Sequence, residues 1–369
     1  MTDLILALDQ GTTSSRSILF TEKAEIRAVT SEPLECRYPD SGWVEQDAEA
    51  IWETQRSTIV KVLDQAGIGL SEVSAIGITN QRESTIAWNR ETGEALCPAI
   101  NWQCRRTARF CDELKEEGFD ELIRNRTGLV TDPYFSGTKM HWILQNVPEA
   151  ANLARQGKLC FGTVDSWLIW KLSGGTTHAI EISNASRTLV FDIQKCEWDS
   201  EILSRFGIPP ESLPEVVPSS GVIAEVDESL FGGSAPIAGA AGDQQAALFG
   251  QACFSPGMAK NTYGTGCFMI SNTGKHLVRS QNGLLTTIGW KLGDEVTYAL
   301  EGSVFIAGAL VQWLRDGLEL FNDAAETESM ALSVPDSGGV FVVPAFVGLG
   351  APHWAVSYTH LRAHETDSS

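Results

Sequence analysis

Residues 4–20 read LILALDQGTTSSRSILF, two apolar runs that flank a short polar turn. Apolar runs of strand length on either side of a glycine-containing turn predict a β-hairpin. The turn holds one carboxylate, four consecutive hydroxyl side chains and an arginine. Gly11 permits a tight backbone, so the amides and hydroxyls after it are able to wrap an anion, and Asp9 is placed to hold a hydrated magnesium ion beside it. This stretch alone leaves an ordinary hydroxyl-rich turn equally open.

Composition narrows the class of protein. A chain of 369 residues with 43% hydrophobic content has room for two or three globular domains. Its net charge of −20 argues against nucleic acid and anionic membranes as partners. The first residues lack a signal-type segment, and the most apolar late run, residues 340–347, is too short for a membrane span. The eight cysteines form no Cys-x-x-Cys pair, which predicts reduced cysteines in a cytoplasmic protein.

Predicted helices and strands alternate along the chain, a pattern typical of α/β domains. Asp47 is expected to cap a helix that ends at Gly67. Residues 73–79 predict a buried strand, and residues 85–88 and 95–100 predict a second hairpin. Further segments are a helix over 105–117, amphipathic helices over 136–145 and 163–172, a proline-dense connector over 209–218, and a short buried strand over 237–240.

The amino-terminal pattern has a weak echo later in the chain. Residues 258–270, MAKNTYGTGCFMI, again predict strand, glycine-and-threonine turn, and strand. Two phosphate-binding hairpins imply two similar domains that face each other across one nucleotide. We therefore expect a first domain over residues 1–250 and a second that begins at residue 251.

Phosphoryl transfer requires positioned phosphates, neutralised charge and one base near the attacking hydroxyl. Besides the first hairpin, Gly264-Thr265-Gly266 would let backbone amides approach phosphates closely. Asp243 follows a glycine at a predicted strand-to-helix junction and is the expected base. Arg82 and Glu83 offer a donor and an acceptor for adjacent hydroxyls of a polyol. The candidate apolar walls for its carbon skeleton are Trp102, Tyr134 and Phe268.

Each of these clusters also has a simpler interpretation. Asp243 would otherwise cap a helix, and Arg82 with Glu83 would form a solvated surface pair. Trp102 would be a core residue, and residues 264–266 a plain turn. The presence of all the parts of a kinase site in one chain favours the kinase interpretation.

Six motifs resemble the FGGY carbohydrate kinase family and, within it, the glycerol kinases. They are LDQGTTSSR (8–16), TNQRE (79–83), NWQ (101–103), DPYFSGTK (132–139), GDQQA (242–246) and NTYGTG (261–266). The similarity runs from about residue 4 to Trp354, and the second, third and fourth motifs together point to glycerol. The implied fold is the two-domain α/β fold of actin-like ATPases and sugar kinases, which is ribonuclease H-like.

The resemblance implies ATP-dependent phosphorylation of glycerol to sn-glycerol 3-phosphate, with Asp243 as general base and Mg-ATP between two lobes. The implied glycerol-binding residues are Arg82, Glu83, Trp102, Tyr134, Asp243, Gln244 and Phe268. The implied ATP-binding residues are Thr12, Thr13, Ser14, Arg16, Thr265, Gly308 and Gln312. Mg²⁺ is expected near Asp9 and Asp243, and glycerol and ATP/ADP are the expected partners. A homodimer or a homotetramer is left open.

After Trp354 the sequence departs from the family. Residues 356–369 lack apolar periodicity and match none of its motifs, so we interpret them as a non-native tail. This interpretation leaves the second domain, residues 251–355, incomplete and predicts an impaired fragment. Two alternative functions stay open: another FGGY sugar kinase that acts on a pentulose or hexulose, and a non-enzymatic actin-like nucleotide-binding protein.

Overall fold

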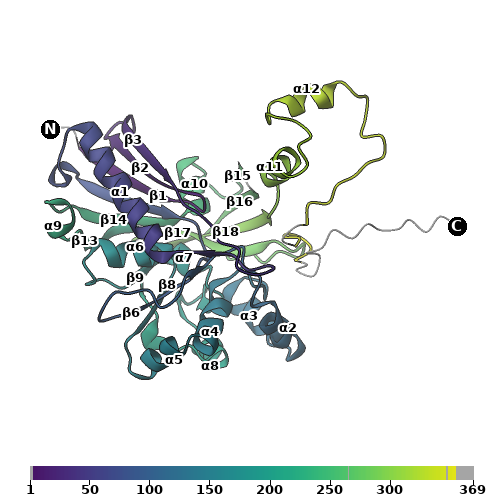
Figure 1. Ribbon diagram of the computed structural model, residues 1–369. Coiled ribbons are helices and arrows are strands. Elements are labelled where there is room, and N and C mark those ends of the chain that lie inside the picture. The colour runs from purple at the N-terminus through teal and green to yellow at the C-terminus, as the bar shows by residue number, and fades with distance from the viewer. Residues whose placement is uncertain (1–2, 265, 346–347, 355–369) are drawn as a thin grey trace.

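A computed structural model describes residues 3–264, 266–345 and 348–354, so the tail over residues 356–369 lies outside the described residues. The fold is built on a sheet of ten strands in the order β15-β16-β18-β17-β13-β14-β5-β1-β2-β3 (Figure 1). Its strands are β1 (Leu4–Gln10), β2 (Ser14–Thr21), β3 (Ile26–Pro33), β5 (Ala75–Asn80), β13 (Ser220–Glu225), β14 (Pro236–Gly242), β15 (Ala259–Tyr263), β16 (Cys267–Gly274), β17 (Leu285–Leu292) and β18 (Glu295–Val304).

The predicted amino-terminal hairpin is confirmed. Strands β1 and β2 pair antiparallel, with Asp9 opposite Arg16. Alternate leucines of β1 are buried, as the period of a half-buried strand requires. Helix α1 (Ala48–Ala66) packs on β2 and β3. It begins after Asp47, whose carboxylate accepts the amides of residues 49 and 50, and it ends at Gly67 with φ of 67°.

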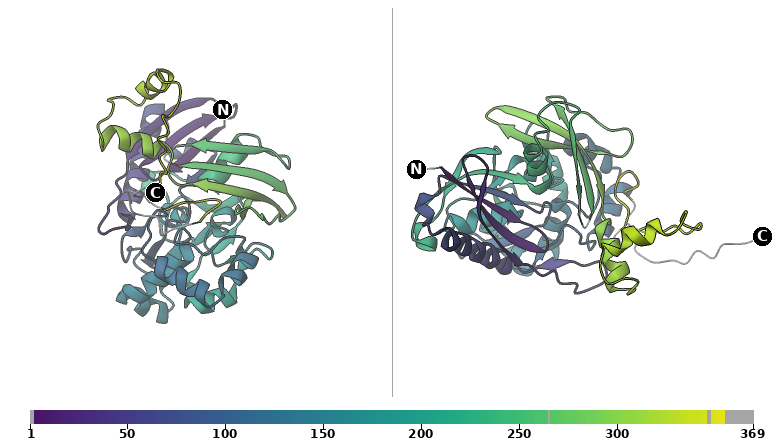
Figure 2. Two further views of the ribbon diagram at one scale, coloured as in Figure 1. Left: turned by 90° about the vertical axis from the view of Figure 1, so that its right-hand side faces the viewer. Right: turned by 90° about the horizontal axis from the view of Figure 1, so that it is seen from above.

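The second predicted hairpin of this kind, over residues 258–270, is confirmed as the antiparallel pair β15 and β16. Strands β18 and β17 continue the sheet from β16. This half joins the amino-terminal half through one parallel bridge between Ser220 of β13 and Leu292 of β17. Viewed from above, the purple and the green strands form two separate groups (Figure 2). The ten strands are therefore two sheet halves with a narrow seam.

Short strand pairs and helices complete the fold. The strand pairs are β4 (Glu45–Gln46) with β7 (Ala99–Ile100), β6 (Ile86–Asn89) with β8 (Leu159–Gly162), β9 (Ala179–Glu181) with β12 (Glu215–Val217), and β10 (Phe191–Asp192) with β11 (Glu197–Trp198). The remaining helices are η1 (Leu70–Glu72), α2 (Ala108–Glu116), α3 (Asp120–Thr127), α4 (Ser136–Asn146), α5 (Pro148–Arg155), α6 (Val164–Leu172), α7 (Ile182–Ala185), α8 (Ser200–Phe206), η2 (Pro210–Ser212), α9 (Glu228–Phe231), α10 (Asp243–Gly250), α11 (Gly308–Asp316) and α12 (Glu326–Leu332).

Three predicted segments differ from the structure. Helix α6 is not amphipathic, because every residue except Lys171 is buried where the helix packs among α1, β5, β8, β9 and β14. Strand β6 takes β8 as its main partner, so residues 95–100 contribute isolated bridges such as Trp88 to Ala95 rather than a regular hairpin. The connector over 209–218 contains η2 and β12.

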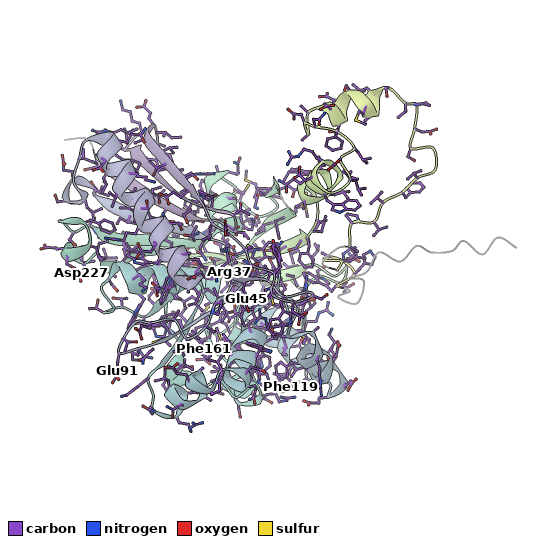
Figure 3. All side chains as sticks on the ribbon, viewed as in Figure 1. Arg37, Glu45, Glu91, Phe119, Phe161 and Asp227 are labelled. Atoms are coloured by element: carbon purple, nitrogen blue, oxygen red, sulfur yellow. The ribbon has the colours of Figure 1, made fainter. Side chains whose placement is uncertain are left out.

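Two large apolar clusters form the core. One lies between the amino-terminal half of the sheet, α1 and α6. The other fills the helical region that contains α2 to α5 and α8, below the sheet in Figure 1. Phe161 belongs to this cluster, and Phe119 packs against the cluster; both are labelled in Figure 3. Arg37 and Glu45, which pair their backbones, lie where the two regions meet (Figure 3). Within the described residues, no helix is long and apolar enough to cross a bilayer.

Candidate active site

A cleft of about 480 Å³ lies between the turn of the first hairpin and the turn of the β15–β16 hairpin. This size is within the range of small-molecule sites. Its lining residues are Thr12, Thr13, Cys36, Tyr38, Gln81, Arg82, Glu83, Trp102, Gln103, Tyr134, Asp243, Gln244, Thr262, Gly264, Gly266, Phe268, Ala309 and Gln312. Both halves of the sheet therefore contribute walls to one cavity.

Most of the predicted site residues converge on this cleft. The predicted polyol residues all line it: Arg82, Glu83, Trp102, Tyr134, Asp243, Gln244 and Phe268. Of the predicted nucleotide residues, Thr12, Thr13 and Gln312 line it, whereas Ser14, Arg16 and Gly308 do not. The amide of Gly308 donates to the carbonyl of Gly264, which places it at the rim. Thr265 lies outside the described residues.

Sheet topology explains this convergence. Strands β1 and β14 flank β5 in parallel, and Gln10 and Gly242 both pair with Asn80. The carboxyl ends of the three strands therefore lie at one edge of the sheet. Open parallel sheets bind ligands at this edge. The turn after β1, the loop after β5 and the start of α10 all open onto it.

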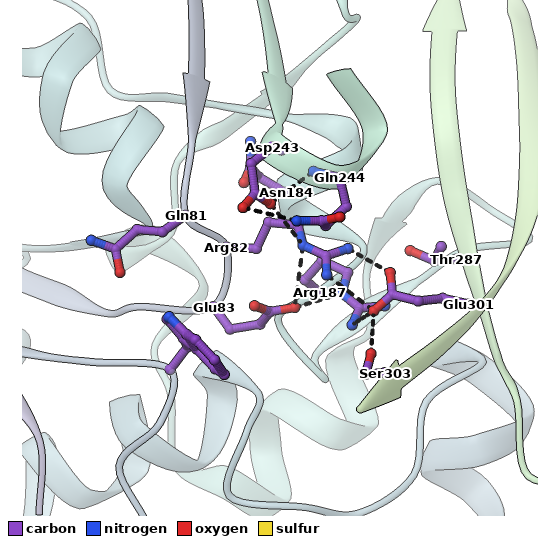
Figure 4. A network of polar contacts seen from close by, with 12 residues as sticks. Gln81, Arg82, Glu83, Asn184, Arg187, Asp243, Gln244, Thr287, Glu301 and Ser303 are labelled. Carbon is purple, nitrogen blue, oxygen red and sulfur yellow. Dashed lines mark hydrogen bonds and ion pairs between the residues drawn. The ribbon is translucent and has the colours of Figure 1, made fainter. Parts of the chain in front are cut away.

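Arg82 is buried rather than solvated, so the surface-pair interpretation is wrong (Figure 4). Its Nη1 and Nη2 donate to the two carboxylate oxygens of Glu301 at 2.6 and 3.0 Å. Its Nε lies 3.4 Å from Oδ1 of Asp243. Gly242 makes room for this side chain, because a Cβ at residue 242 would stand 2.7 Å from Cδ of Arg82.

Glu83 is held in a strained backbone conformation beside Arg82. Its φ of 61° lies in the left-handed region, which non-glycine residues rarely occupy. Its Oε1 accepts a hydrogen bond of 2.7 Å from Nε of Arg187, and Nη2 of Arg187 donates to Glu301 at 2.9 Å. Burial raises the pKa of Glu83, while Arg82 and Arg187 oppose the shift.

Aromatic rings form one wall of the cleft. Trp102 meets the rings of Tyr134 and Phe268 edge-on, at centroid distances of 5.8 and 6.1 Å. Trp102 is also packed in the helical-region core with 8% of its surface exposed, so it is a core residue that lines the cleft. Its Nε1 donates a hydrogen bond to Oγ1 of Thr12. The apolar wall and the hairpin turn are therefore connected.

Asp243 is the first residue of α10, directly after β14. The cap position belongs to Gly242, so the helix-cap interpretation of Asp243 is wrong. The carboxylate of Asp243 accepts the amide of Gln244, and its side chain is 38% exposed toward the cleft. Burial raises the pKa of Asp243, and the positive charge of Arg82 partly opposes this shift. A carboxylate in this position is able to accept a proton.

Comparison with protein families identifies the fold. The FGGY family of carbohydrate kinases matches residues 4–250 with its N-terminal domain and residues 259–361 with its C-terminal domain. This chain belongs to that family. The predicted two-domain carbohydrate kinase fold, of the actin-like ATPase class, is confirmed.

Individual relatives of this FGGY chain are glycerol kinases. The glycerol kinase of Symbiobacterium thermophilum is 60% identical over 350 residues, which cover 95% of this chain and 70% of that protein. Glycerol kinase 2 of Thermotoga maritima is 58% identical over 350 residues, which cover 95% of this chain and 71% of that protein. The crystal structure of Plasmodium falciparum glycerol kinase with ADP superposes with a TM-score of 0.85 at 35% identity, covering 96% of this chain and 71% of that one.

Two charged residues of the FGGY chain's second half do not line the cleft but contact residues that do, and sequence reasoning missed both. Glu301 of β18 binds Arg82, and Lys260 of β15 contacts Oε1 of Gln244 and donates to Thr262 at 2.8 Å. Arg187, which follows α7, was missed as well. A glutamate among the largely apolar residues 296–304 was the one available signal, whereas the burial of Arg187 is known only from the structure.

Asp9 and Asp243 are the residues that the sequence predicts to lie near Mg²⁺. Asp9 does not line the cleft, and its carboxylate lies 3.6 Å from Arg16. Asp9 pairs directly with Thr79 of β5, and Thr79 pairs on its other side with Ala241 of β14. The buried hydroxyl of Thr79 has no hydrogen-bond partner among the described residues. Among the described residues there is no cluster of three or more metal-ligating side chains. Mg²⁺ often takes only one or two carboxylates plus substrate phosphates, so the oxygen-only donors fit it.

Proposed function

We propose that this FGGY kinase transfers the γ-phosphoryl group of ATP to glycerol, giving sn-glycerol 3-phosphate and ADP. The observation that carries the proposal is the convergence of every predicted polyol residue on one cleft, with the Asp243 carboxylate exposed to it. The identity of 60% to a glycerol kinase supports glycerol over other acceptors.

The cleft supplies the contacts that a small polyol needs. Glu83 is an acceptor for one hydroxyl, and Arg82 and Gln244 are donors for its neighbour. The rings of Trp102 and Phe268 would cover the carbon skeleton. A triol bound here would be oriented by polar groups on one side and by apolar contact on the other.

Asp243 would perform the proton transfer of the reaction. As the terminal hydroxyl oxygen of glycerol forms a bond to the γ-phosphorus, the bond from that phosphorus to the β,γ-bridging oxygen breaks. The hydroxyl proton passes to the carboxylate of Asp243, and the bridging electron pair leaves with ADP. The raised pKa of Asp243 makes its carboxylate a stronger base than an exposed one.

The two hairpin turns would hold the nucleotide. Thr12 and Thr13 offer hydroxyls and amides, with Ser14 and Arg16 behind them, and Gly264 and Gly266 offer close backbone approach. A side chain has no room at residue 266, because a Cβ there would stand 2.5 Å from the carbonyl oxygen of Val304. The proposed set is completed by Gly308, Gln312 and Thr265.

The proposed cofactor is Mg²⁺, with Asp9 and Asp243 as the residues that would hold it. When bound, the ion neutralises phosphate charge during transfer. The cytoplasm is the proposed location, in keeping with eight unpaired cysteines. A homodimer or homotetramer stays a prediction.

A substrate comparison tests the proposal. Purified chain is assayed for ADP release with glycerol, xylulose and gluconate, at matched concentrations and with Mg-ATP. We expect glycerol to give the highest kcat/KM by at least about 100-fold, because sites built on hydrogen bonds discriminate strongly. A higher kcat/KM for xylulose or for gluconate than for glycerol would favour the alternative function, that of another FGGY sugar kinase. ATP binding without phosphorylation of any of the three would favour the non-enzymatic alternative.

A further inference from the structure

A residue from the second half of the sheet binds the side chains on the polyol side of the cleft. Glu301 lies on β18, within the segment matched by the C-terminal family domain, whereas Arg82 lies in the N-terminal one. The Glu301 carboxylate is fully buried and binds Arg82 in a bidentate fork (Figure 4). Paired, parallel hydrogen bonds of this kind fix the plane of a guanidinium as well as its position.

A second path runs from Glu301 to the other polyol residue. Arg187 donates from Nη2 to Glu301 and from Nε to Glu83 (Figure 4). The hydroxyl of Ser303 donates to Glu301 at 2.8 Å and completes its shell. One carboxylate therefore sets the orientation of both Arg82 and Glu83, directly in the first case and through Arg187 in the second.

The charges are consistent with a fixed, ionised carboxylate. Burial works against ionisation of Glu301, but Arg187 and Arg82 outweigh it and lower its pKa to about 2. With both Nη groups of Arg82 engaged by Glu301, only its Nε side faces Asp243, at 3.4 Å. Without Glu301, the guanidinium would keep only the longer bonds to Gln245 at 3.2 Å and Tyr134 at 3.4 Å, and we expect its fork to turn toward Asp243.

We infer that Glu301 is a positioning residue for the polyol: it orients Arg82 and Glu83, and it makes a complete polyol site depend on docking of the second half of the sheet. This inference rests on the proposed function and adds a named contribution of β18 to it. Glu301 is expected to affect binding of glycerol more than binding of ATP, because Arg82 and Glu83 do not belong to the proposed nucleotide set.

The first test compares Glu301→Gln with the parent chain in steady-state kinetics. We expect the glycerol KM to rise about 10- to 100-fold, as misplaced positioning groups commonly cause. The ATP KM is expected to stay within about twofold. Asp192→Asn is the matched control, because it also removes a buried carboxylate from an arginine pair, at 3.5 Å from Arg126 and away from the cleft. Equal effects of Glu301→Gln on both KM values, or a control that also raises the glycerol KM, would overturn the inference.

A double-mutant cycle separates positioning from general support of the fold. In an Arg82→Gln background, adding Glu301→Gln should raise the glycerol KM by a smaller factor than it does in the parent chain, because only the path through Arg187 to Glu83 is left. A full additional rise would contradict the inference. If Glu301→Gln does not fold, Glu301→Asp takes its place. The shorter carboxylate cannot reach both arginines, so an unchanged glycerol KM in that variant would also contradict it.

A crystal structure of the variant decides the question independently of activity. We expect the Arg82 guanidinium of Glu301→Gln to leave its present position and approach Asp243. If it stays where it is, Glu301 does not position it, whatever the substrate is. A preference for xylulose or gluconate over glycerol in the substrate comparison would instead refute the proposed function, while this structural result would still stand.

Discussion

The indole nitrogen of Trp102 donates a hydrogen bond of 2.9 Å to the hydroxyl of Thr12. One residue belongs to the apolar wall of the proposed glycerol site, and the other belongs to the turn proposed to hold ATP phosphates. The bond therefore connects the proposed glycerol site directly to the turn proposed to hold ATP.

Replacement of Thr12 by Val should weaken glycerol binding. The indole N–H then has no described acceptor, and the ring is less firmly held against Tyr134 and Phe268. We expect a rise of about 3- to 10-fold in the glycerol KM, the size of one lost neutral hydrogen bond. Thr12→Ser keeps the hydroxyl and is the control. Equal KM values for Thr12→Val and Thr12→Ser would show that the bond does not matter for binding.

Gly242→Ala should disturb Arg82 directly. The new Cβ would stand 2.7 and 2.8 Å from Cδ and Cγ of Arg82, so the side chain must move. We expect a loss of about 1–3 kcal/mol in the free energy of unfolding, together with a higher glycerol KM. Chemical denaturation and steady-state kinetics measure the two effects.

Gly250→Ala is the control for that substitution. It lies at the end of the same helix, α10, and its Cβ would meet no atom within 4 Å. We expect stability equal to or up to about 1 kcal/mol above the parent chain, with unchanged KM values. A Gly242→Ala variant that matches Gly250→Ala in both measurements would contradict the packing argument.

Stability should depend on pH through Glu181. Burial raises the pKa of this carboxyl to about 7, whereas Ser183 and Ser219 donate to it and limit the shift. The folded state therefore favours its protonated form. The stabilisation is complete below the unfolded pKa, about 4.3 for Glu, and is lost as pH rises through about 7.

Thermal unfolding from pH 4.5 to 8 measures this contribution. We expect Glu181→Gln, which stays neutral, to flatten the fall in melting temperature with rising pH relative to the parent chain. Glu225→Gln on β13, where the glutamate is exposed, serves as the control and should leave the slope unchanged. Parallel curves for Glu181→Gln and the parent would refute the argument.

The kinetic pH profile should report Asp243. Burial raises the pKa of Asp243 above the ordinary value for Asp, which is about 3.9. As the pH falls, Asp243 therefore loses its proton-accepting carboxylate form at a higher pH than an ordinary aspartate does. We expect kcat/KM for glycerol to fall on the acid side with an apparent pKa above that value. An acid limb at or below that value would contradict the effect of burial on the pKa of Asp243.

Local patterns were sufficient to predict the elements that position the site. The two hairpins and the capped helix α1 depend on contacts between residues close in sequence, so turn chemistry and alternation revealed them. The predicted polyol residues also converge as expected.

Long-range contacts could not be predicted in the same way. Arg82 and Glu301 are 219 positions apart, and no local pattern pairs them. The dipeptide of Arg82 and Glu83 therefore fitted a solvated surface as well as a buried network. Helix α6 was misassigned for a similar reason, since its burial on all sides arises from packing among α1 and four strands.

The most direct test of the central claim is glycerol-dependent ADP release by the parent chain and by Asp243→Asn, with Asp192→Asn as the matched control. We predict that the parent and the control phosphorylate glycerol, while Asp243→Asn loses about 10²- to 10⁴-fold in kcat, the usual contribution of a general base. An Asp243→Asn protein that turns over glycerol at the parental rate would contradict the account.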